Sequence, residues 1–564
     1  MGEGGNLKRS TPHNDIMRFS TASAISLLIF LGSLASLPTA SGQPLPGRFS
    51  EPLEKPAMPP AAPGTYRLGT SPRMISPYAG FTSYQVNVDA NGNNIVGDAA
   101  NEPSISVDPT DGNKITIGWR QFNTYTSNFR QSGYGYTTDA GITWHFPGVL
   151  QNNVFRSDPV TNSDETGNFF YLSLLVNTFC GDIWRSTNGG QSWVERSPDG
   201  AAHSGDKEWF TLDRTPTSMG HGFQYQFWTE GLACDFGGFN RSTDGGATWQ
   251  SPISIPQFPQ WGTLDVASNG NLFIGGGDSG SSFWCIRSSN AQNPAVTPTF
   301  DQITTVNMGG SLWFGPPVNP GGLAGQIFLA VDRSGGPTNN NIYMVATVLP
   351  AGFGTGTDVM FARSTNGGAS FSPPHRINDD PVNHSKYHYF GTIGVAPNGR
   401  IDSVWLDTRN AANNTDSQLF YSYSTDGGVT WAPNVQVSNS FTPLEGWPQQ
   451  NKIGDYITIV SDNTGGDVAY SATFNFNATR GQHEQDVYFV RVSPSGGATP
   501  TPTATASPTA TATATATATV TPTATATATV SATPTATPTS TPRVTPTPRS
   551  GPSARPRPTP APRP

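Results

Sequence analysis

Short runs of alternating apolar and polar residues, separated by turns, fill the middle of this chain. One run is Pro103-Ser-Ile-Ser-Val-Asp108, and the next is Lys114-Ile-Thr-Ile-Gly-Trp119. Alternation with a period of two is typical of half-buried β-strands. Comparable strand starts recur near Asp158, Asp206, Trp261, Gln326, Tyr389 and Asp455. The pattern predicts an all-β protein made of seven similar units.

A recurring octapeptide marks the same place in most of these units. It reads STDGGATW from Ser242, and its relatives start at Thr137, Ser186, Ser364 and Ser424. The spacing is nearly even except for one gap twice as long, where Arg287 to Asn290 keeps a remnant of the motif. Internal repeats of this size indicate a propeller, a solenoid or an array. Four-stranded units that close into a ring lose their exposed sheet ends, which favours a single β-propeller.

The last unit stops after its third strand, which runs from Asp486 to Arg491. A spare alternating strand, 83–89, precedes the first unit. We therefore expect this N-terminal strand to supply the missing outer strand and to close the ring. Seven blades are predicted, and six remain the alternative if the unit near Trp261, which lacks the motif, is an irregular insertion.

The two ends of the chain do not resemble the repeats. Residues 1–42 combine a short positive start, a 14-residue apolar stretch and small residues before Gln43, which indicates a cleaved signal peptide; a short membrane anchor is the weaker alternative. Residues 43–82 form a Pro-rich connector, and residues 83–497 hold the propeller. The Thr/Pro/Ala-rich tail, 498–564, cannot bury a core and is predicted to be disordered. We expect a secreted or cell-surface protein with no membrane span after signal cleavage.

Composition narrows the class of partner. Only 12% of the residues are charged and the formal net charge is −8, so no basic surface for nucleic acid is expected. Three cysteines exclude a disulfide scaffold and a cysteine-based zinc array. Cys180 and Cys234 occupy similar places in adjacent units, so a disulfide between them is plausible, with Cys285 left over.

The octapeptides resemble the Asp box of the sialidase (neuraminidase) superfamily, also called the BNR repeat, and the resemblance covers residues 83–497. It implies a β-propeller in which the motif is structural. Asp139, Asp244 and Asp426 can accept hydrogen bonds from turn amides, and the aromatic residue that ends each motif is expected to pack between blades. Each octapeptide joins strands three and four, so it lies on one rim of the ring. Ligands are then expected at the opposite rim, where strand one starts and strand two ends.

Acidic, aromatic and arginine side chains gather at those strand ends. Clustered carboxyls raise one another's pKa, which lets a glycosidase use one residue type as both acid and base. The candidate catalytic residues are Glu102, Asp206, Glu208, Glu230, Tyr389 and Asp407. The candidate substrate-binding residues are Arg120, Arg409, Trp228, Tyr456 and Asp455.

The family resemblance implies a specific chemistry for part of this set. Sialidases bind the sialic-acid carboxylate with three arginines and use an Asp acid/base with a Tyr nucleophile assisted by a Glu. Tyr389 or Tyr456 would be the nucleophile, and Glu208 or Glu230 its base. Arg120 and Arg409 lie at the right rim, whereas Glu102 stands near the place of the arginine motif that precedes the family's first blade.

Three functions fit these features. The first is an exo-glycosidase of sialidase-like architecture that acts on an extracellular glycan or glycoprotein. The second is a non-catalytic carbohydrate-binding or adhesive propeller, in which Trp228 and Trp261 would form exposed stacking platforms. The third is a surface scaffold without a deep pocket. No cofactor is expected, and a bound Ca²⁺ would be structural.

Overall fold

The computed structural model describes residues 69–278 and 280–496. The predicted signal peptide, most of the predicted connector and the predicted tail lie outside the described residues. Every regular element in the described ranges is a β-strand, so the all-β prediction is confirmed. None of these residues forms a helix that could cross a bilayer.

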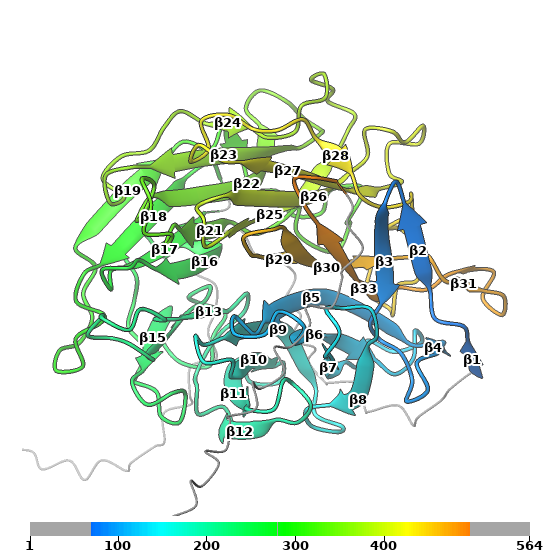
Figure 1. The fold of residues 1–564 in the computed structure, drawn as a ribbon, viewed down its shortest axis with the longest axis horizontal. Coiled ribbons are helices and arrows are strands. Elements are labelled where there is room, and N and C mark those ends of the chain that lie inside the picture. Colours follow the sequence, from blue (N-terminus) through cyan, green and yellow to red (C-terminus); the bar gives the residue numbers. More distant parts are fainter. Residues whose placement is uncertain (1–68, 279, 497–564) are drawn as a thin grey trace, which may run out of the picture. The chain divides into compact units, whose positions relative to one another are not determined.

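Seven antiparallel sheets follow one another around a ring (Figure 1). Blade 1 contains β5 (Ala99–Val107), β6 (Ile115–Phe122), β7 (Gln131–Thr137) and β8 (His145–Val149). Blade 2 contains β9 (Arg156–Ser163), β10 (Phe169–Leu175), β11 (Cys180–Ser186) and β12 (Val194–Ser197). Blade 3 contains β13 (Trp209–Leu212), β14 (Gln224–Phe227) and β15 (Phe239–Ser242), and Ile253 bridges to Phe239 at its outer edge.

The remaining blades complete the ring. Blade 4 contains β16 (Gln260–Val266), β17 (Leu272–Gly277), β18 (Phe283–Ser288) and β19 (Gln302–Val306). Blade 5 contains β21 (Phe328–Val331), β22 (Ile342–Pro350), β23 (Asp358–Ser364) and β24 (His375–Arg376), with β20 (Gly310–Ser311) also paired to β22. Blade 6 contains β25 (His388–Val395), β26 (Ile401–Asp407), β27 (Gln418–Ser424) and β28 (Val435–Gln436). Because β16–β19 form a regular blade, the six-blade alternative is wrong.

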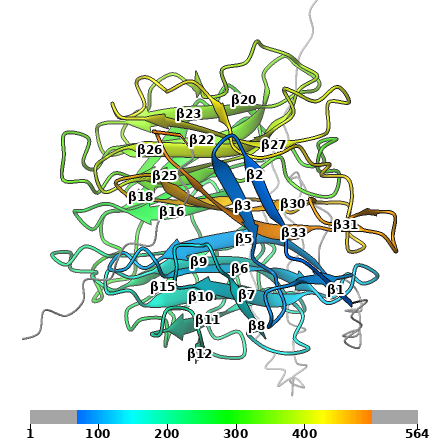
Figure 2. The ribbon, with the colours of Figure 1, turned by 45° about the vertical axis from the view of Figure 1, so that its right-hand side comes forward.

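Blade 7 closes the ring as the sequence predicts. Its chain-terminal strands are β29 (Thr458–Ser461), β30 (Gly466–Ala472) and β33 (Asp486–Val492). The N-terminal β3 (Phe81–Gln85) pairs with β33, placing Tyr84 opposite Phe489, and β2 (Ile75–Tyr78) pairs with β3 as a fifth strand. Figure 2 shows this blue hairpin beside the orange β33. The closing strand is therefore confirmed, although its hairpin begins within the predicted connector.

Two small two-stranded sheets lie outside the blades. β1 (Gly69–Ser71) pairs with β4 (Asn94–Val96), and β31 (Phe476–Asn477) pairs with β32 (Gln482–His483). Strand β4 leads from the closing strand β3 into blade 1. The β1–β4 sheet therefore lies at the seam where the two ends of the ring meet.

Apolar side chains between neighbouring blades form the core. At the seam, Trp119 and Ile105 of blade 1 share a buried cluster with Val487 and Phe489 of blade 7. The octapeptide aromatics contribute as expected: Trp144 packs on Phe489 with ring centroids 5.5 Å apart. Burial of such side chains stabilises each blade interface by roughly 25 cal/mol per Å² of apolar surface removed from water.

Each octapeptide forms a turn organised by its Asp or Asn side chain. The N–H groups of Ala247 and Thr248 donate to Asp244 Oδ1 at 3.0 and 2.9 Å, and Ser242 Oγ donates to the same oxygen. Burial raises the pKa of Asp426 slightly, but hydrogen bonds from Thr430 and Ser424 outweigh it and lower the pKa to about 2. These contacts confirm the structural role predicted for the motif.

The second glycine of the motif is required for two reasons. Gly428 has φ +80°, and an added Cβ would lie 2.3 Å from the Phe361 ring of the neighbouring blade. Gly245, the first glycine of the motif that starts at Ser242, has φ +70° but no atom within 4 Å of an added Cβ. We expect Gly245→Ala to lower the free energy of unfolding by about 1 kcal/mol through backbone strain alone, and Gly428→Ala to lose about 1–3 kcal/mol more through overpacking.

Urea unfolding of both variants, followed by tryptophan fluorescence, measures this difference. Equal losses in the two variants would show that the interblade contact contributes nothing.

Candidate functional site

The rim predicted to carry ligands is defined by the strand pairing. Arg120, near the end of β6, lies opposite Asn101, near the start of β5. At the other end of the same sheet, Ile115 pairs with Thr137, the first octapeptide residue. The candidate residues and the octapeptides therefore lie at opposite ends of blade 1, and the repeat extends this arrangement to the other blades.

A β-bulge recurs near the start of the innermost strand. The pairing skips residues after Asn101 in β5, after Ser157 in β9, after Gln260 in β16 and after Tyr389 in β25. The residue that follows has a positive φ in each blade: Glu102 (+52°), Asp158 (+47°), Trp261 (+50°) and Phe390 (+57°). Lys207, just before β13, has φ +57°. Such strain costs about 1–3 kcal/mol per residue and is concentrated at functional sites in proteins.

Charged side chains from blades 1, 2, 3 and 7 meet in one buried group, which we call the axial cluster. Only the centre of the ring is within reach of all four blades. Its members are Glu102, Arg120, Asp158, Asp206, Lys207, Lys452 and Asp455, all buried.

Ion pairs connect the axial cluster. Asp455 lies 3.1 Å from Lys207 Nζ and 2.8 Å from Lys452 Nζ. Glu102 lies 3.0 Å from Arg120 Nε and 3.2 Å from Lys452 Nζ. Lys207 Nζ is also 3.6 Å from Asp206. Each of the three cations (Arg120, Lys207 and Lys452) therefore faces at least one carboxyl group.

The neutral form of Glu102 is favoured within the axial cluster. Burial raises the pKa of Glu102 to about 8, against the opposite effect of Arg120 and Lys452. A neutral Glu102 avoids part of the large cost of burying charged groups.

Glu208 adds a second proton-bearing carboxyl beside this cluster. Burial, and then the negative charge of Asp158, raise the pKa of Glu208 well above its ordinary value. No other side chain among the described residues hydrogen-bonds to its carboxyl. Tyr456 lies nearby. Burial is the larger cause and the charge of Glu102 the next of a raised pKa for Tyr456. The Tyr456 hydroxyl donates a hydrogen bond to the carbonyl of Pro159 at 2.8 Å.

Two further predicted residues, Asp407 and Arg409, belong to a separate group in blades 5 and 6. Arg409 Nε donates to Asp407 Oδ2 at 2.8 Å, and Arg409 Nη1 lies 2.7 Å from Asp379. His388 Nε2 lies 3.0 Å from Asp380 and 3.6 Å from Asp407. No ion pair between described residues links this group to the axial cluster.

The charge of these aspartates controls His388. Burial lowers the pKa of His388, but Asp407 and Asp380 outweigh burial and raise it above 6.5. In turn, contacts with His388 hold the pKa of Asp380 well below its usual range despite burial. The group is therefore an ion-pair network that favours the charged form of His388.

The other three predicted residues are not members of either group, although Tyr389 follows His388 in β25. Tyr389 is buried and donates to Ser417 Oγ at 2.8 Å, and burial raises its pKa, which is the opposite of what an activated nucleophile needs. Ser254 Oγ donates to Glu230 at 2.8 Å. Trp228 is fully buried and Trp261 is 3% exposed, so the expectation that they form exposed stacking platforms is wrong.

Lys207 and Lys452 belong to the axial cluster, although neither is among the candidate site residues predicted from the sequence. Lys207 lies between the candidate acids Asp206 and Glu208 in the sequence, and this position could have indicated that it belongs to the site. Lys452 precedes Asp455 by three residues in a loop without strand pattern, so nothing in the sequence marked it.

A metal site is not apparent in the parts of the chain that the structure describes. Three ligating groups, His203, Cys234 and Asp235, come together there. Cys234, however, forms the disulfide with Cys180, which confirms that predicted pair and removes the thiolate. Cys285 is the remaining buried thiol, and burial raises its pKa to about 12.

Comparison with known proteins gives distant likenesses. No family model matches the chain. A xyloglucanase from Acetivibrio thermocellus is 25% identical over 422 residues, which is 64% of this chain and 46% of that protein. A xyloglucanase from Paenibacillus sp. is 24% identical over 326 residues, covering 52% and 28% of the two chains. This chain thus spans less than half the length of the curated relatives it matches.

Solved propellers are similar only at low scores. An ulvan lyase of a polysaccharide lyase family is 11% identical, with a TM-score of 0.42 over 70% of this chain and 94% of its own. The phage phi92 endosialidase is 10% identical, with a TM-score of 0.40 over 73% and 69%. These values are too low to support any inference about function.

The network around His388 predicts a pH-dependent contribution to stability. Since the pKa of His388 is raised on folding, its stabilisation is complete below about pH 6.5 and is lost as the pH rises through the folded-state pKa. The loss of unfolding free energy in His388→Gln should therefore be larger at about pH 5.5 than at about pH 9. Exposed His145→Gln is the matched control. A loss independent of pH would contradict the ion-pair assignment.

Proposed function

We propose that this chain is an exported glycoside hydrolase that acts on an extracellular glycan at the rim where the innermost strands start. The observation that carries the proposal is a pair of buried acids in different surroundings at the start of blade 3. Burial and the charge of Asp158 raise the pKa of Glu208 well above its ordinary value, whereas Asp206, two residues away, lies 3.6 Å from Lys207 Nζ. Two carboxyl groups in opposite protonation states are what glycosidic hydrolysis requires.

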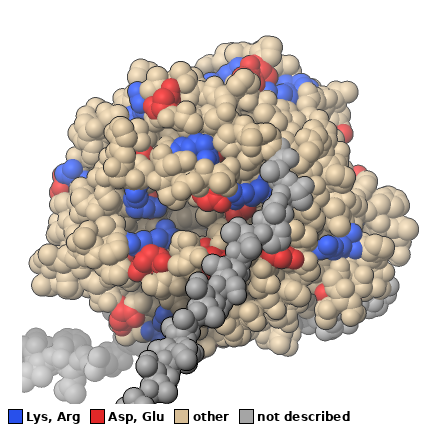
Figure 3. Space-filling view, viewed as in Figure 1, with Lys and Arg blue, Asp and Glu red and all other residues tan. Residues whose placement is uncertain are grey.

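In this proposal each residue has one task. Glu208 protonates the oxygen of the leaving sugar, and Asp206 either takes a proton from the attacking water or bonds to the anomeric carbon. Tyr456 and Asp455 lie beside these groups and would contact the substrate. Figure 3 shows charged side chains of both signs around a hollow in the middle of one face.

We further propose a neutral glycan over a sialoside. Arg120 is paired with Glu102, and Arg409 is paired with Asp407 and Asp379. Arg120 is also fully buried, so its guanidinium cannot reach a sialic-acid carboxylate, and the carboxylates that hold Arg409 compete with the bidentate pair that such a ligand needs. The xyloglucanase names of the distant relatives agree with a neutral polysaccharide. Two sequence-based predictions, activity on sialosides and release of single sugars from a chain end, are left for experiment to test.

Hydrolysis of a panel of neutral polysaccharides and sialosides tests the proposal. We expect release of reducing sugar from at least one neutral glycan, with kcat lowered about 10²–10⁴-fold in Glu208→Gln and Asp206→Asn. Because Glu208 acts as an acid with a raised pKa, kcat should persist well above pH 4.5 and fall as the pH rises through that pKa. The anomeric form of the first product reports whether configuration is retained or inverted.

The control is Asp301→Asn, which removes an exposed carboxyl that pairs with Arg287 on the octapeptide rim. Its kcat should equal that of the unmodified chain. Glycan binding without any hydrolysis would overturn the enzyme proposal in favour of the carbohydrate-binding alternative.

A further inference from the structure

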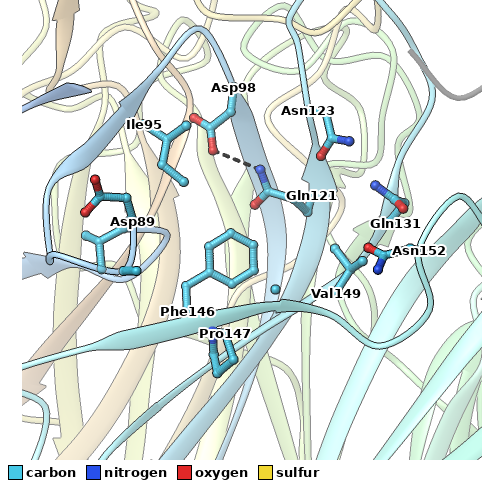
Figure 4. Close-up of a pocket in the computed structure, with 13 residues that line it drawn as sticks. Asp89, Ile95, Asp98, Gln121, Asn123, Gln131, Phe146, Pro147, Val149 and Asn152 are labelled. Carbon is cyan, nitrogen blue, oxygen red and sulfur yellow. Dashed lines mark hydrogen bonds between the residues drawn. The ribbon is translucent and has the colours of Figure 1, made fainter. Parts of the chain in front are cut away.

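A pocket of about 300 Å³ lies at the seam of the ring, apart from the residues discussed so far (Figure 4). One wall comes from the segment between β3 and β4, and the other comes from β6, β7 and β8 of blade 1. The lining residues are Val88, Asp89, Ala90, Ile95, Asp98, Gln121, Asn123, Gln131, Phe146, Pro147, Gly148, Val149 and Asn152.

Asp98 is the buried polar group of this pocket. It is 2% exposed, and Gln121 Nε2 donates to its Oδ2 at 2.8 Å. Its Oδ1 has no hydrogen-bond partner among the described residues. Burial and the charge of Asp486 raise the pKa of Asp98 well above the ordinary value, which favours its neutral form. A buried polar atom left unpaired is costly unless a ligand or water satisfies it.

Three carboxamides surround the same space. Asn123 and Asn152 make no side-chain hydrogen bond to any described residue, and Gln131 accepts one from the N–H of Asn153 at 2.6 Å. Their NH₂ and C=O groups are therefore available as uncharged donors and acceptors. Figure 4 shows these three side chains grouped on one side of the pocket.

An aromatic face completes the lining. The Phe146 ring lies below the Asp98–Gln121 pair in Figure 4, and Trp119 packs against it with centroids 5.0 Å apart. Packing by Trp119 fixes the ring orientation. Pro147 and Val149 extend this apolar surface along β8.

We propose that this seam pocket binds a neutral sugar residue, with Asp98, Asn123 and Asn152 bonding its hydroxyls and Phe146 lying against its apolar face. Uncharged donors and acceptors facing an apolar ring complement a sugar, which has hydroxyls at its edge and C–H groups on its faces. No Lys, Arg or His lines the pocket, so a phosphate or a sugar acid has no cationic partner there. The volume is at the small end of ligand sites and suits one or two sugar rings.

A cation is the competing occupant, because two carboxyls line the pocket. Asp89 Oδ1, however, already accepts the N–H groups of Asn91 and Asn93. The raised pKa of Asp98 disfavours its charged form, which a cation would need as a ligand. The pocket therefore favours a hydroxylated ligand over Ca²⁺.

Binding of D-xylose, D-glucose and D-galactose to the full chain tests the inference by saturation-transfer NMR and thermal denaturation. At least one sugar should bind saturably and raise the Tm, because the ligand contacts both sides of the seam that closes the ring. The double variant Asn123→Ala/Asn152→Ala should weaken Kd by about tenfold or more, as two hydrogen bonds are lost. Gln191→Ala, an exposed amide on the octapeptide rim, should bind as the unmodified chain does.

The outcomes separate this site from the catalytic proposal. Glu208→Gln should keep sugar binding at the seam while losing hydrolysis, and the double variant should keep hydrolysis of a short chromogenic glycoside. Absence of saturable binding by all three sugars, or equal binding by the double variant, would overturn the inference. So would a rise in Tm with Ca²⁺ that disappears in Asp98→Asn, which would identify a cation site.

Discussion

Closure of the ring by β3 and β33 is the interaction on which the other features depend. It joins residues about 400 positions apart in the chain, such as Tyr84 and Phe489. Antiparallel pairing at this seam covers the free edge of β33, and it holds blade 1 against blade 7. Only then can Glu102 of blade 1 reach Lys452, just before β29 of blade 7. Without closure, half of the axial cluster would lose its partners.

The axial cluster is costly to maintain, and the repeated bulge shows how the fold achieves it. A positive φ near the start of successive inner strands directs Glu102, Asp158 and Lys207 into one shared space. Both the backbone strain and the burial of ions oppose folding. Pairing of opposite charges and the proton on Glu102 offset the electrostatic part. Burial of ion pairs at such expense, in a protein with few charges, is better explained by function than by stability.

The repeat made much of the fold predictable. The octapeptides predicted which rim faces away from the motif, the hydrogen bonds within each turn, and the aromatic residues that pack between blades. These features depend on local sequence that recurs in each unit. The ion-pair partners of the charged side chains could not be predicted in the same way. Nothing local indicates that Arg120 pairs with Glu102, that Lys452 joins them, or that Asp380 approaches His388 from a loop. Trp228 and Trp261 were expected on the surface because their positions in the strands place them at the rim. Their burial depends on side chains of neighbouring blades, which the position in a strand does not reveal. The seam pocket was equally hidden, because it forms only where the chain ends meet.

The distribution of cations decides which ligands the molecule can recognise. On the strand-start rim, Arg120 is fully buried beside Glu102 and Arg409 is held by two aspartates, so neither presents a free guanidinium to an acidic sugar. At the seam, the described lining residues include carboxamides and a buried carboxyl but no cationic side chain. In our proposals, both places would therefore disfavour anionic ligands, the rim because its arginines are buried or paired and the seam because of its composition. A propeller that binds a neutral polysaccharide at two points would gain effective concentration at the rim from its seam. Such a gain in effective concentration would explain why the pocket lies on the same side of blade 1 as the rim.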